Sequence, residues 1–228
     1  MDRARHFQPA AGWLQSACLA RVVDIADPER QNRVQVRLLA FDAVDGQDVP
    51  LWARVVCPFA GADRGAFLMP DVDDEVLVVF LQGDPRYPLI IGGLWSGANA
   101  APAELGDEGN RFKRIRSKNG VTVTLDDRQG QEQLVLETPG GQKLTLADGP
   151  GKVTVEDANG NRVEMAAARI SITASAEVKI DAPQIKVSAG LVTVDTAMAK
   201  FSGIVKCEVL QATSVVSTSY TPGAGNIW

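Results

Sequence analysis

The sequence predicts an all-β protein in two parts, a small closed barrel followed by a long needle of short strands. Three observations lead to this expectation. The first half contains five short apolar runs separated by turn residues, without a convincing helical pattern. The second half repeats two apolar residues around one polar residue at near-constant spacing. Clusters of glycine, asparagine and aspartate lie between the runs, where tight turns need them.

The barrel is expected over residues 19–97, after an N-terminal arm at residues 1–18. Its strand candidates are Leu19–Ile25, Arg33–Leu39, Leu51–Val56, Val76–Phe80 and Leu89–Gly92. The turn signals between them include Asp27-Pro28, Gly61, Gly65 and Gly83-Asp84-Pro85. Five short strands in this span favour a Greek-key barrel of the OB type. Residues 98–112, rich first in alanine and proline and then in glycine, are expected as a linker.

The needle is expected over residues 113–218, followed by a tip segment at residues 219–228. In its upper part, apolar runs recur about every ten residues, at Val121–Leu125, Leu134–Leu136, Leu144–Leu146, Val153–Val155 and Val163–Met165. Further on, the spacing between runs shortens: Ile170-Ser-Ile172, Val178-Lys-Ile180, Ile185-Lys-Val187 and Val192-Thr-Val194 begin 8, 7 and 7 residues apart. The next step of 7 reaches Ala199-Lys-Phe201. Alternation within each run places one side in a core and the other in water.

Runs this short cannot bury their apolar side within one chain. A coil of 7 residues is too short to close a single-chain β-helix, so three identical chains must wind together. We therefore predict an intertwined trimeric β-helix or β-prism, and an obligate homotrimer. Nine side chains are expected to form the trimer core: Ile170, Ile172, Val178, Ile180, Ile185, Val187, Val192, Val194 and Phe201.

Composition argues against catalysis. The only histidine, His6, lies in the N-terminal arm outside the expected barrel, where a Ser-His-Asp or Cys-His arrangement is implausible, so neither an enzymatic activity nor a cofactor is expected. The carboxylates of Asp71, Asp73, Asp74 and Glu75 crowd one turn, whereas a glycosidase needs two carboxylates opposed across a cleft.

Neither a disulfide framework nor a metal site is expected. Cys18, Cys57 and Cys207 are odd in number and widely spaced, and we expect them to be buried as small hydrophobic residues. Residues Asp157–Asn161 are similar to the start of an EF-hand loop, but Arg162 stands where that loop needs glycine.

Two stretches of the sequence resemble a known family. The runs Leu51–Val55, Met69–Val76 and Phe80–Trp95 resemble the OB domain of contractile-tail spikes. The turn motifs of residues 116–161, followed by the Ile-x-Ile repeats, resemble the shaft of the same proteins. The family is the central spike of contractile injection systems, which includes the phage baseplate assembly protein V and the VgrG proteins of type VI secretion. The resemblance implies a structural, membrane-piercing spike in the baseplate of a virion or injection particle, assembled in the bacterial cytoplasm.

The resemblance also implies partners. VgrG proteins carry a hub domain before the barrel, and only about 18 residues precede it here, so we expect a separate hub protein. The hub would contact one end of the barrel and the arm residues Phe7, Trp13 and Leu14, unless the arm only covers the barrel base. Contact with the target membrane would be transient.

The tip segment suggests one further partner. Some spikes of this family end in a metal site built from His-x-His pairs, but this sequence has no histidine after His6. We expect Tyr220 and Trp228 either to form a platform for a separate PAAR-type tip protein, which would hold any metal, or to fold back and cap the prism.

Two other functions fit part of the pattern. OB barrels bind single-stranded nucleic acid, but residues 19–97 hold 7 Arg and no Lys against 12 Asp plus Glu, whereas a nucleic-acid groove is basic. No nucleic-acid partner is therefore expected. Receptor-binding tail fibres also form intertwined trimers, but they usually end in a globular head, and here the repeats run nearly to the last residue.

Overall fold

The computed structural model describes residues 16–41, 49–106 and 109–219. The arm residues Phe7, Trp13 and Leu14 and the tip residues Tyr220 and Trp228 lie outside these ranges, so their expected roles stay predictions. The described residues form strands, turns and two short 3-10 segments, which confirms the predicted all-β class. No helix in this part of the chain is long and apolar enough to cross a lipid bilayer.

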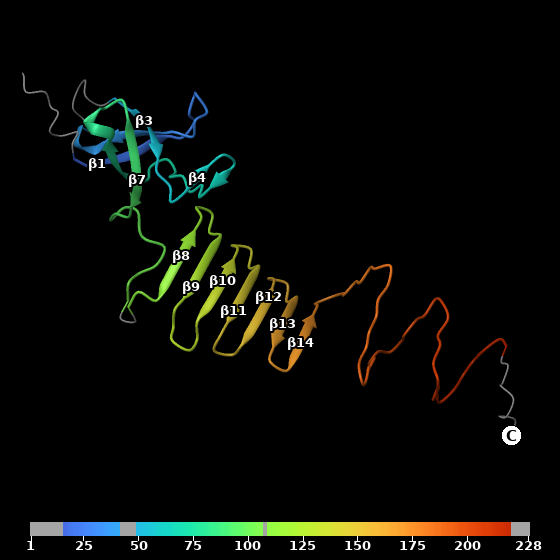
Figure 1. Cartoon of the computed structure of the whole chain (residues 1–228). Helices are drawn as coiled ribbons and strands as arrows, with labels where there is room; N and C mark the ends of the chain where they lie inside the picture. The colour runs from blue at the N-terminus through green and yellow to red at the C-terminus, as the bar shows by residue number, and fades with distance from the viewer. Residues whose placement is uncertain (1–15, 42–48, 107–108, 220–228) are drawn as a thin grey trace, which may run out of the picture. The chain divides into compact units, whose positions relative to one another are not determined.

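Five strands close the N-terminal barrel (Figure 1). They are β1 (Cys18–Asp24), β2 (Val34–Leu38), β3 (Leu51–Val55), β6 (Glu75–Phe80) and β7 (Pro88–Leu94). Their order is β1-β2-β3-β7-β6, and β6 pairs with β1 to complete the ring. All neighbours are antiparallel except β3 and β7, which are parallel. The five strands match the five predicted runs, and the OB-type barrel is confirmed.

Alternate residues of these strands fill the barrel interior. The largest side chains that are fully buried are Val22, Val34, Val36, Val76, Val78 and Ile90. In β2 every second residue is buried, as expected for a strand with one face in the core. β-Branched residues suit this position because they are stiff and pack well on a pleated surface.

Strand directions determine which loops share an end of the barrel. β1, β3 and β7 run one way, and β2 and β6 run the other way. The last residues of β1, β3 and β7 therefore share one end, which we call the C-terminal rim because the chain leaves the barrel there. The N-terminal rim, at the opposite end, carries the short 3-10 segments Leu39–Phe41 and Leu81–Gly83.

A small hairpin follows β3 at the C-terminal rim, and the sequence pattern does not predict it. It consists of β4 (Ala60–Gly61) and β5 (Arg64–Gly65). Gly65 has a φ of +151°, and a Cβ added there would lie 2.9 Å from the carbonyl oxygen of Phe59. Only glycine can lie this close to the carbonyl oxygen of Phe59, so Gly65 is required for the hairpin to close.

Residues 112–173 form a seven-stranded antiparallel sheet in which consecutive strands are neighbours (Figure 1). The strands are β8 (Phe112–Arg116), β9 (Thr122–Asp126), β10 (Gln133–Glu137), β11 (Lys143–Ala147), β12 (Lys152–Glu156), β13 (Arg162–Ala166) and β14 (Arg169–Thr173). β9 to β14 coincide with predicted runs. β8 is an additional strand, Phe-Lys-Arg-Ile-Arg, without the two apolar residues spaced two apart that the other six strands contain.

Three turns on one side of this sheet repeat the same chemistry. The side-chain oxygens of Ser117, Thr138 and Asp157 each accept a hydrogen bond from the backbone N–H four residues later, at 3.0, 3.3 and 2.9 Å. The fourth residue of each turn is a glycine with positive φ. The turns therefore have equal lengths, which keeps the strands they connect in matching register.

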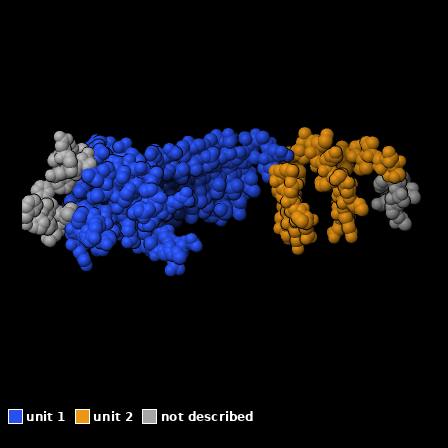
Figure 2. Space-filling view, turned by 90° about the horizontal axis from the view of Figure 1, so that it is seen from above, with its two compact units in different colours: residues 1–178 blue, residues 179–228 orange. Residues whose placement is uncertain are grey.

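The chain beyond β14 differs from everything before it. Residues 174–219 contain no hydrogen-bonded strand within one chain, and residues 179–219 belong to a separate unit (orange in Figure 2). The expected strands at residues 178–180, 185–187 and 192–194 are therefore absent from a single copy. The repeats that predict them lack partners for their backbone groups in one chain.

The prediction of buried cysteines is wrong for Cys18 and Cys57, and for Cys207 it stays a prediction about the trimer. Cys18 and Cys57 are only partly buried, and Cys207 is exposed. Cys18 lies at the start of β1 and Cys57 in the loop before β4, so each has only partial cover. Cys207 belongs to the segment that one chain leaves unpacked.

Candidate functional site: an uncovered apolar face

One face of the seven-stranded sheet is apolar across nearly its whole width. The strand registers align its residues in two rows. The first row, from β8 to β14, is Ile115, Val123, Leu136, Leu144, Val155, Val163 and Ile172. The second row is Lys113, Leu125, Leu134, Leu146, Val153, Met165 and Ile170. Lys113 is the single polar member of these two rows, which we call the apolar rows.

Nothing in the described chain covers the apolar rows. Leu146 is 39% exposed, Val155 48% and Ile115 58%, although side chains of this type are usually buried. An open hollow of about 730 Å³ lies over the first row and is lined by Val123, Leu136, Leu144, Val155, Val163 and Ile172. A contiguous apolar surface of this kind marks an interaction site.

The opposite face of the sheet satisfies its polar groups within one chain. The carboxylate of Glu164 accepts hydrogen bonds from Lys152 at 3.2 Å and Arg169 at 3.3 Å, and also from Arg162. These bonds, that from Lys152 foremost, lower the pKa of Glu164. Only 9% of Glu164 is exposed, and Thr154 beside it is buried. Glu164 on this face thus has its partners within one chain, whereas the apolar rows on the other face are exposed.

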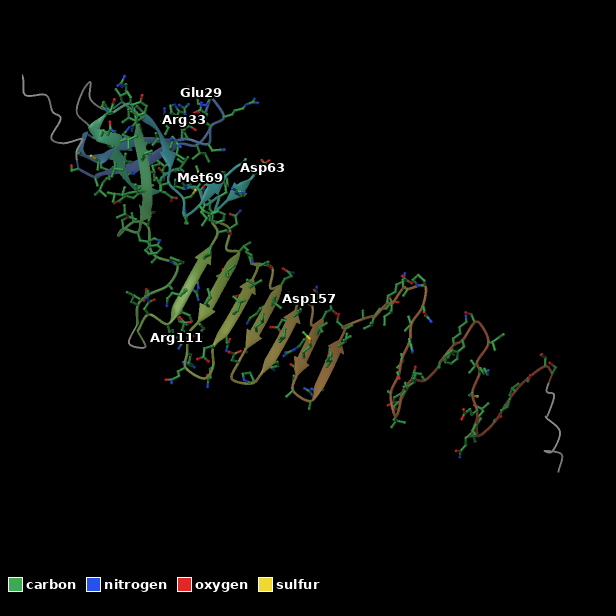
Figure 3. All side chains as sticks on the ribbon, in the orientation of Figure 1. Glu29, Arg33, Asp63, Met69, Arg111 and Asp157 are labelled. Carbon is green, nitrogen blue, oxygen red and sulfur yellow. The ribbon has the colours of Figure 1, made fainter. Side chains whose placement is uncertain are left out.

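The point where the chain leaves the sheet is fixed by a short series of hydrogen bonds (Asp157 is labelled in Figure 3). Asp157 accepts from the side-chain amide of Asn161 at 2.8 Å, and this bond is the main cause of the lowered pKa of Asp157. The side-chain amide oxygen of Asn161, Oδ1, in turn accepts a hydrogen bond from the backbone N–H of Ser175 at 2.9 Å. The turn before β13 thereby holds the first residues after β14.

The residues predicted as trimer core fall into two groups. Ile170 and Ile172 end the apolar rows. The other seven lie after β14, and all nine side chains are between 56% and 72% exposed. Their role in a trimer stays a prediction, because a single chain contains no partner for them.

The predicted list of trimer-core residues omitted most members of the apolar rows. The missed residues are Ile115, Val123, Leu125, Leu134, Leu136, Leu144, Leu146, Val153, Val155, Val163 and Met165. The apolar-polar-apolar signature that identifies their strands is the same one that identifies Ile170-Ser-Ile172, so this signal could have included most of them.

No group of three metal-ligating side chains occurs in residues 16–41, 49–106 and 109–219. The apolar rows and the hollow over the first row form a surface suited to packing against apolar side chains.

Comparison with known families agrees with this description. Residues 18–95, the barrel, match the family described as the type VI secretion system/phage-baseplate injector OB domain. Residues 133–196, from β10 into the repeats after β14, match the phage baseplate V C-terminal trimerisation domain. The second match supports a homotrimer, and it contains most of the apolar rows.

Several curated proteins are similar to part of the chain. The type VI secretion system spike protein VgrG4b of Pseudomonas aeruginosa is 37% identical over 114 residues, which is 47% of this chain and 14% of that protein. VgrG5 of the same organism is 39% identical over 115 residues, with the same shares. VgrG3 of Vibrio cholerae is 35% identical over 89 residues, 37% of this chain and 9% of that protein. The chain thus spans a small fraction of the length of these relatives.

The small barrel and the uncovered apolar face are typical of proteins that complete their core by associating with further copies of themselves. The two family matches identify the family. The chain combines the OB injector domain and the C-terminal trimerisation domain of phage baseplate V and VgrG-like spikes.

Proposed function

We propose that this chain forms the homotrimeric central spike of a contractile phage tail or a phage-derived injection particle, and that it pierces the target membrane. Its role is structural, without a catalytic step. The observation that carries the proposal is the apolar face of the sheet, which continues into exposed apolar repeats beyond β14. A structure with this much uncovered apolar surface is complete only when copies associate.

In the proposed trimer, the three sheets turn their apolar rows toward a common axis. Burying one Leu, Ile or Val side chain contributes about 1.5–3 kcal/mol, so a core of many such residues per chain makes the trimer obligate. The seven predicted core residues from Val178 to Phe201 extend this core into the segment after β14, where strands from different copies provide one another with backbone partners. The charged faces remain in water.

The same arrangement suits the transmission of force. Hydrogen bonds between antiparallel strands run perpendicular to the strands, so in a stack of strands they run along the needle. A compressive load from a contracting sheath would then be shared by every level of the needle. The dense core keeps its volume under load because protein interiors have low compressibility.

We propose that the N-terminal rim of the barrel faces the hub. The rim exposes Leu81 and Tyr87, each 54% exposed, and β1 begins there, next to the segment that contains Phe7, Trp13 and Leu14. A separate hub protein would bind both. Loss of residues 1–17 should leave the trimer intact and prevent co-purification with the hub, and unchanged hub binding would refute this contact.

At the other end, Tyr220 and Trp228 of three copies would present a platform to a PAAR-type tip protein. Pull-down from intact particles with and without residues 219–228 tests this contact. Retrieval of the same proteins by both spikes would contradict it.

The spike function is tested with two substitutions on adjacent residues of β11. Leu144 belongs to the apolar rows, and Thr145 points to the opposite face. In the strain that encodes the chain, Leu144→Asp should abolish both the trimer and the assembly of particles able to inject. Thr145→Asp, the matched control, should preserve both. Normal injection by particles carrying Leu144→Asp would contradict the proposal.

A further inference from the structure

The β4–β5 hairpin at the C-terminal rim carries an exposed apolar surface of its own. Phe59 precedes β4, and Phe67 and Leu68 follow β5; their exposed fractions are 61%, 72% and 68%. The hairpin is a defined element, with Asp63 at its turn and Met69 at its base (Figure 3). Met69 packs against the barrel core and anchors it. Two exposed phenylalanines on an anchored hairpin indicate a contact surface, because aromatic residues are enriched at protein interfaces.

A second apolar surface lies on the same rim. The pairing of Glu75 with Leu94 joins the turn before β6 to the end of β7. Val72, Leu94 and Trp95 are 42%, 38% and 71% exposed there. Asn99 donates a hydrogen bond to the carbonyl oxygen of Asp73 at 3.4 Å, so the departing chain is attached to this turn. We call this second area the acidic surface, since Asp73 and Glu75 border it.

The two surfaces have complementary charges. Arg64 is exposed on the hairpin, and its side chain crosses Gly61, where an added Cβ would lie 2.7 Å from its Nε. On the acidic surface, Asp71 lies 3.5 Å from Lys118 of the same chain, and the side chain of Asp73 is exposed beside it. Glu75 lies opposite Arg21 of β1 in the strand register, so Asp73 is the carboxylate placed to meet an arginine from another copy. Each barrel thus carries an apolar surface with a positive charge and another with negative charges.

A second copy of this chain is the partner that these features fit. Both surfaces lie on the rim from which the chain runs on to the trimerisation domain. Residues 96–111 connect that rim to β8, so a trimer keeps three barrels at an effective concentration of about millimolar. A ring of three copies needs a head-to-tail contact, in which one surface meets a different surface of the next copy. Two different, complementary surfaces on one rim meet this requirement.

We propose that the β4–β5 hairpin of each copy packs on the acidic surface of the next copy and closes the three barrels into a ring. Phe59, Phe67 and Leu68 would cover Val72, Leu94 and Trp95, and Arg64 would pair with Asp73. The inference rests on the proposed trimer and adds a contact outside the trimerisation domain.

Hydroxyl-radical footprinting of the intact, hub-free trimer measures this contact side chain by side chain. Leu81 and Tyr87, on the other rim, are the internal reference, because they are less exposed than Phe67 and Leu68 in one chain. Corrected for intrinsic reactivity, Phe67 and Leu68 should be modified about fivefold more slowly than the reference residues, as expected for side chains in a fully buried interface core. Equal or faster modification of the hairpin residues would overturn the proposal.

A charge exchange separates the specific contact from general crowding. Arg64→Glu and Asp73→Arg should each raise the modification rate of Phe67 severalfold, and the double variant should restore the protected rate. Absence of rescue by the double variant would contradict the pairing of Arg64 with Asp73. The native mass of each variant is measured in parallel: a trimer with an unprotected hairpin overturns this inference alone, whereas a wild-type monomer overturns the proposed function as well.

Discussion

A single carboxylate organises the loop between β1 and β2. Asp27 accepts hydrogen bonds from the backbone N–H groups of Glu29, Gln31 and Arg33, at 3.1, 2.8 and 3.1 Å. The Arg33 guanidinium also donates to it at 2.8 Å and lies 5.9 Å from the ring centre of Trp52. Asp27 thereby supplies the acceptors that this loop lacks in its own backbone.

This arrangement predicts how the barrel responds to acid. The bond from Arg33 is the main cause that holds the pKa of Asp27 well below its usual range, and Arg86 similarly lowers the pKa of Asp84 to about 2. A carboxylate with a lowered pKa in the folded state stabilises the fold above its unfolded pKa and stops doing so as the pH falls through its folded value. The melting temperature of the barrel should therefore stay level from pH 7 to about 5 and fall below about 4.

Asp27→Asn tests the assignment to this residue. The variant should melt at a lower temperature at neutral pH, and its melting temperature should fall less between pH 4 and 2 than that of the wild type. Thermal melting followed by circular dichroism across this range measures both quantities. Parallel curves for the two proteins would exclude Asp27 as the source of the acid response.

Cys207 reports on the segment beyond β14. It is exposed in one chain, yet Val205-Lys-Cys207 has the alternation of the apolar repeats, which would place the thiol in the trimer core. We expect Cys207 of the native protein to resist alkylation and to react rapidly in denaturant. Peptide mapping after labelling distinguishes it from Cys18 and Cys57. Rapid labelling of native Cys207 would mean that this part of the core stays open.

At the scale of elements, the sequence predicts the strands whose composition alternates and misses the others. β9 and β11 to β14 each hold two apolar residues around a polar one, β10 holds the wholly apolar run Leu134–Leu136, and the five barrel strands are apolar runs between turns. β8 has the sequence Phe-Lys-Arg-Ile-Arg, and β4 and β5 contain only alanine, glycine and arginine. None of these three strands shows a periodic pattern of apolar residues. Their positions depend on pairing with neighbours, and local sequence does not encode this.

The apolar rows were missed for a related reason. The runs that contain Leu136, Leu144 and Val155 are visible in the sequence, but their alignment into one row depends on the register of three strands. Turn length and hydrogen bonding set that register. For the repeats after β14, the constant spacing of the runs and the alternation of apolar and polar residues within each run were enough to predict a core. No register within the chain was needed, because the strand partner of each run is expected in another copy.

The turns provide a direct test of register. Gly141 has a φ of +83°, and a Cβ added there would lie 3.0 Å from the Cβ of Ala158 in the next turn on the same side. Gly130 has a φ of +72° and no atom within 4 Å of that position. Each change to alanine costs about 1–2 kcal/mol from the left-handed backbone alone. Gly141→Ala should lower the urea midpoint further than Gly130→Ala, because it also separates two turns.

Equal midpoints for these two variants would show that the turns do not pack on one another. A larger effect of Gly130→Ala would contradict the account of the sheet in which stacked turns help to fix the register.

At the scale of the whole molecule, the barrel and the regions after it follow different rules. The barrel buries Val22, Val36 and Ile90 within one chain. The sheet buries only polar residues, such as Thr154 and Glu164, and leaves its apolar face uncovered. Residues 174–219 bury no side chain in one chain. The share of side chains that one chain buries thus falls along the described part of the sequence.

The most direct test of this account is the native mass of the full chain, measured by analytical ultracentrifugation over a wide range of concentrations. An obligate homotrimer should give a single species of three times the 24.3 kDa chain mass, with no folded monomer on dilution. A stable, folded species of 24.3 kDa would contradict it, because the apolar rows and the repeats after β14 would then have to remain in water.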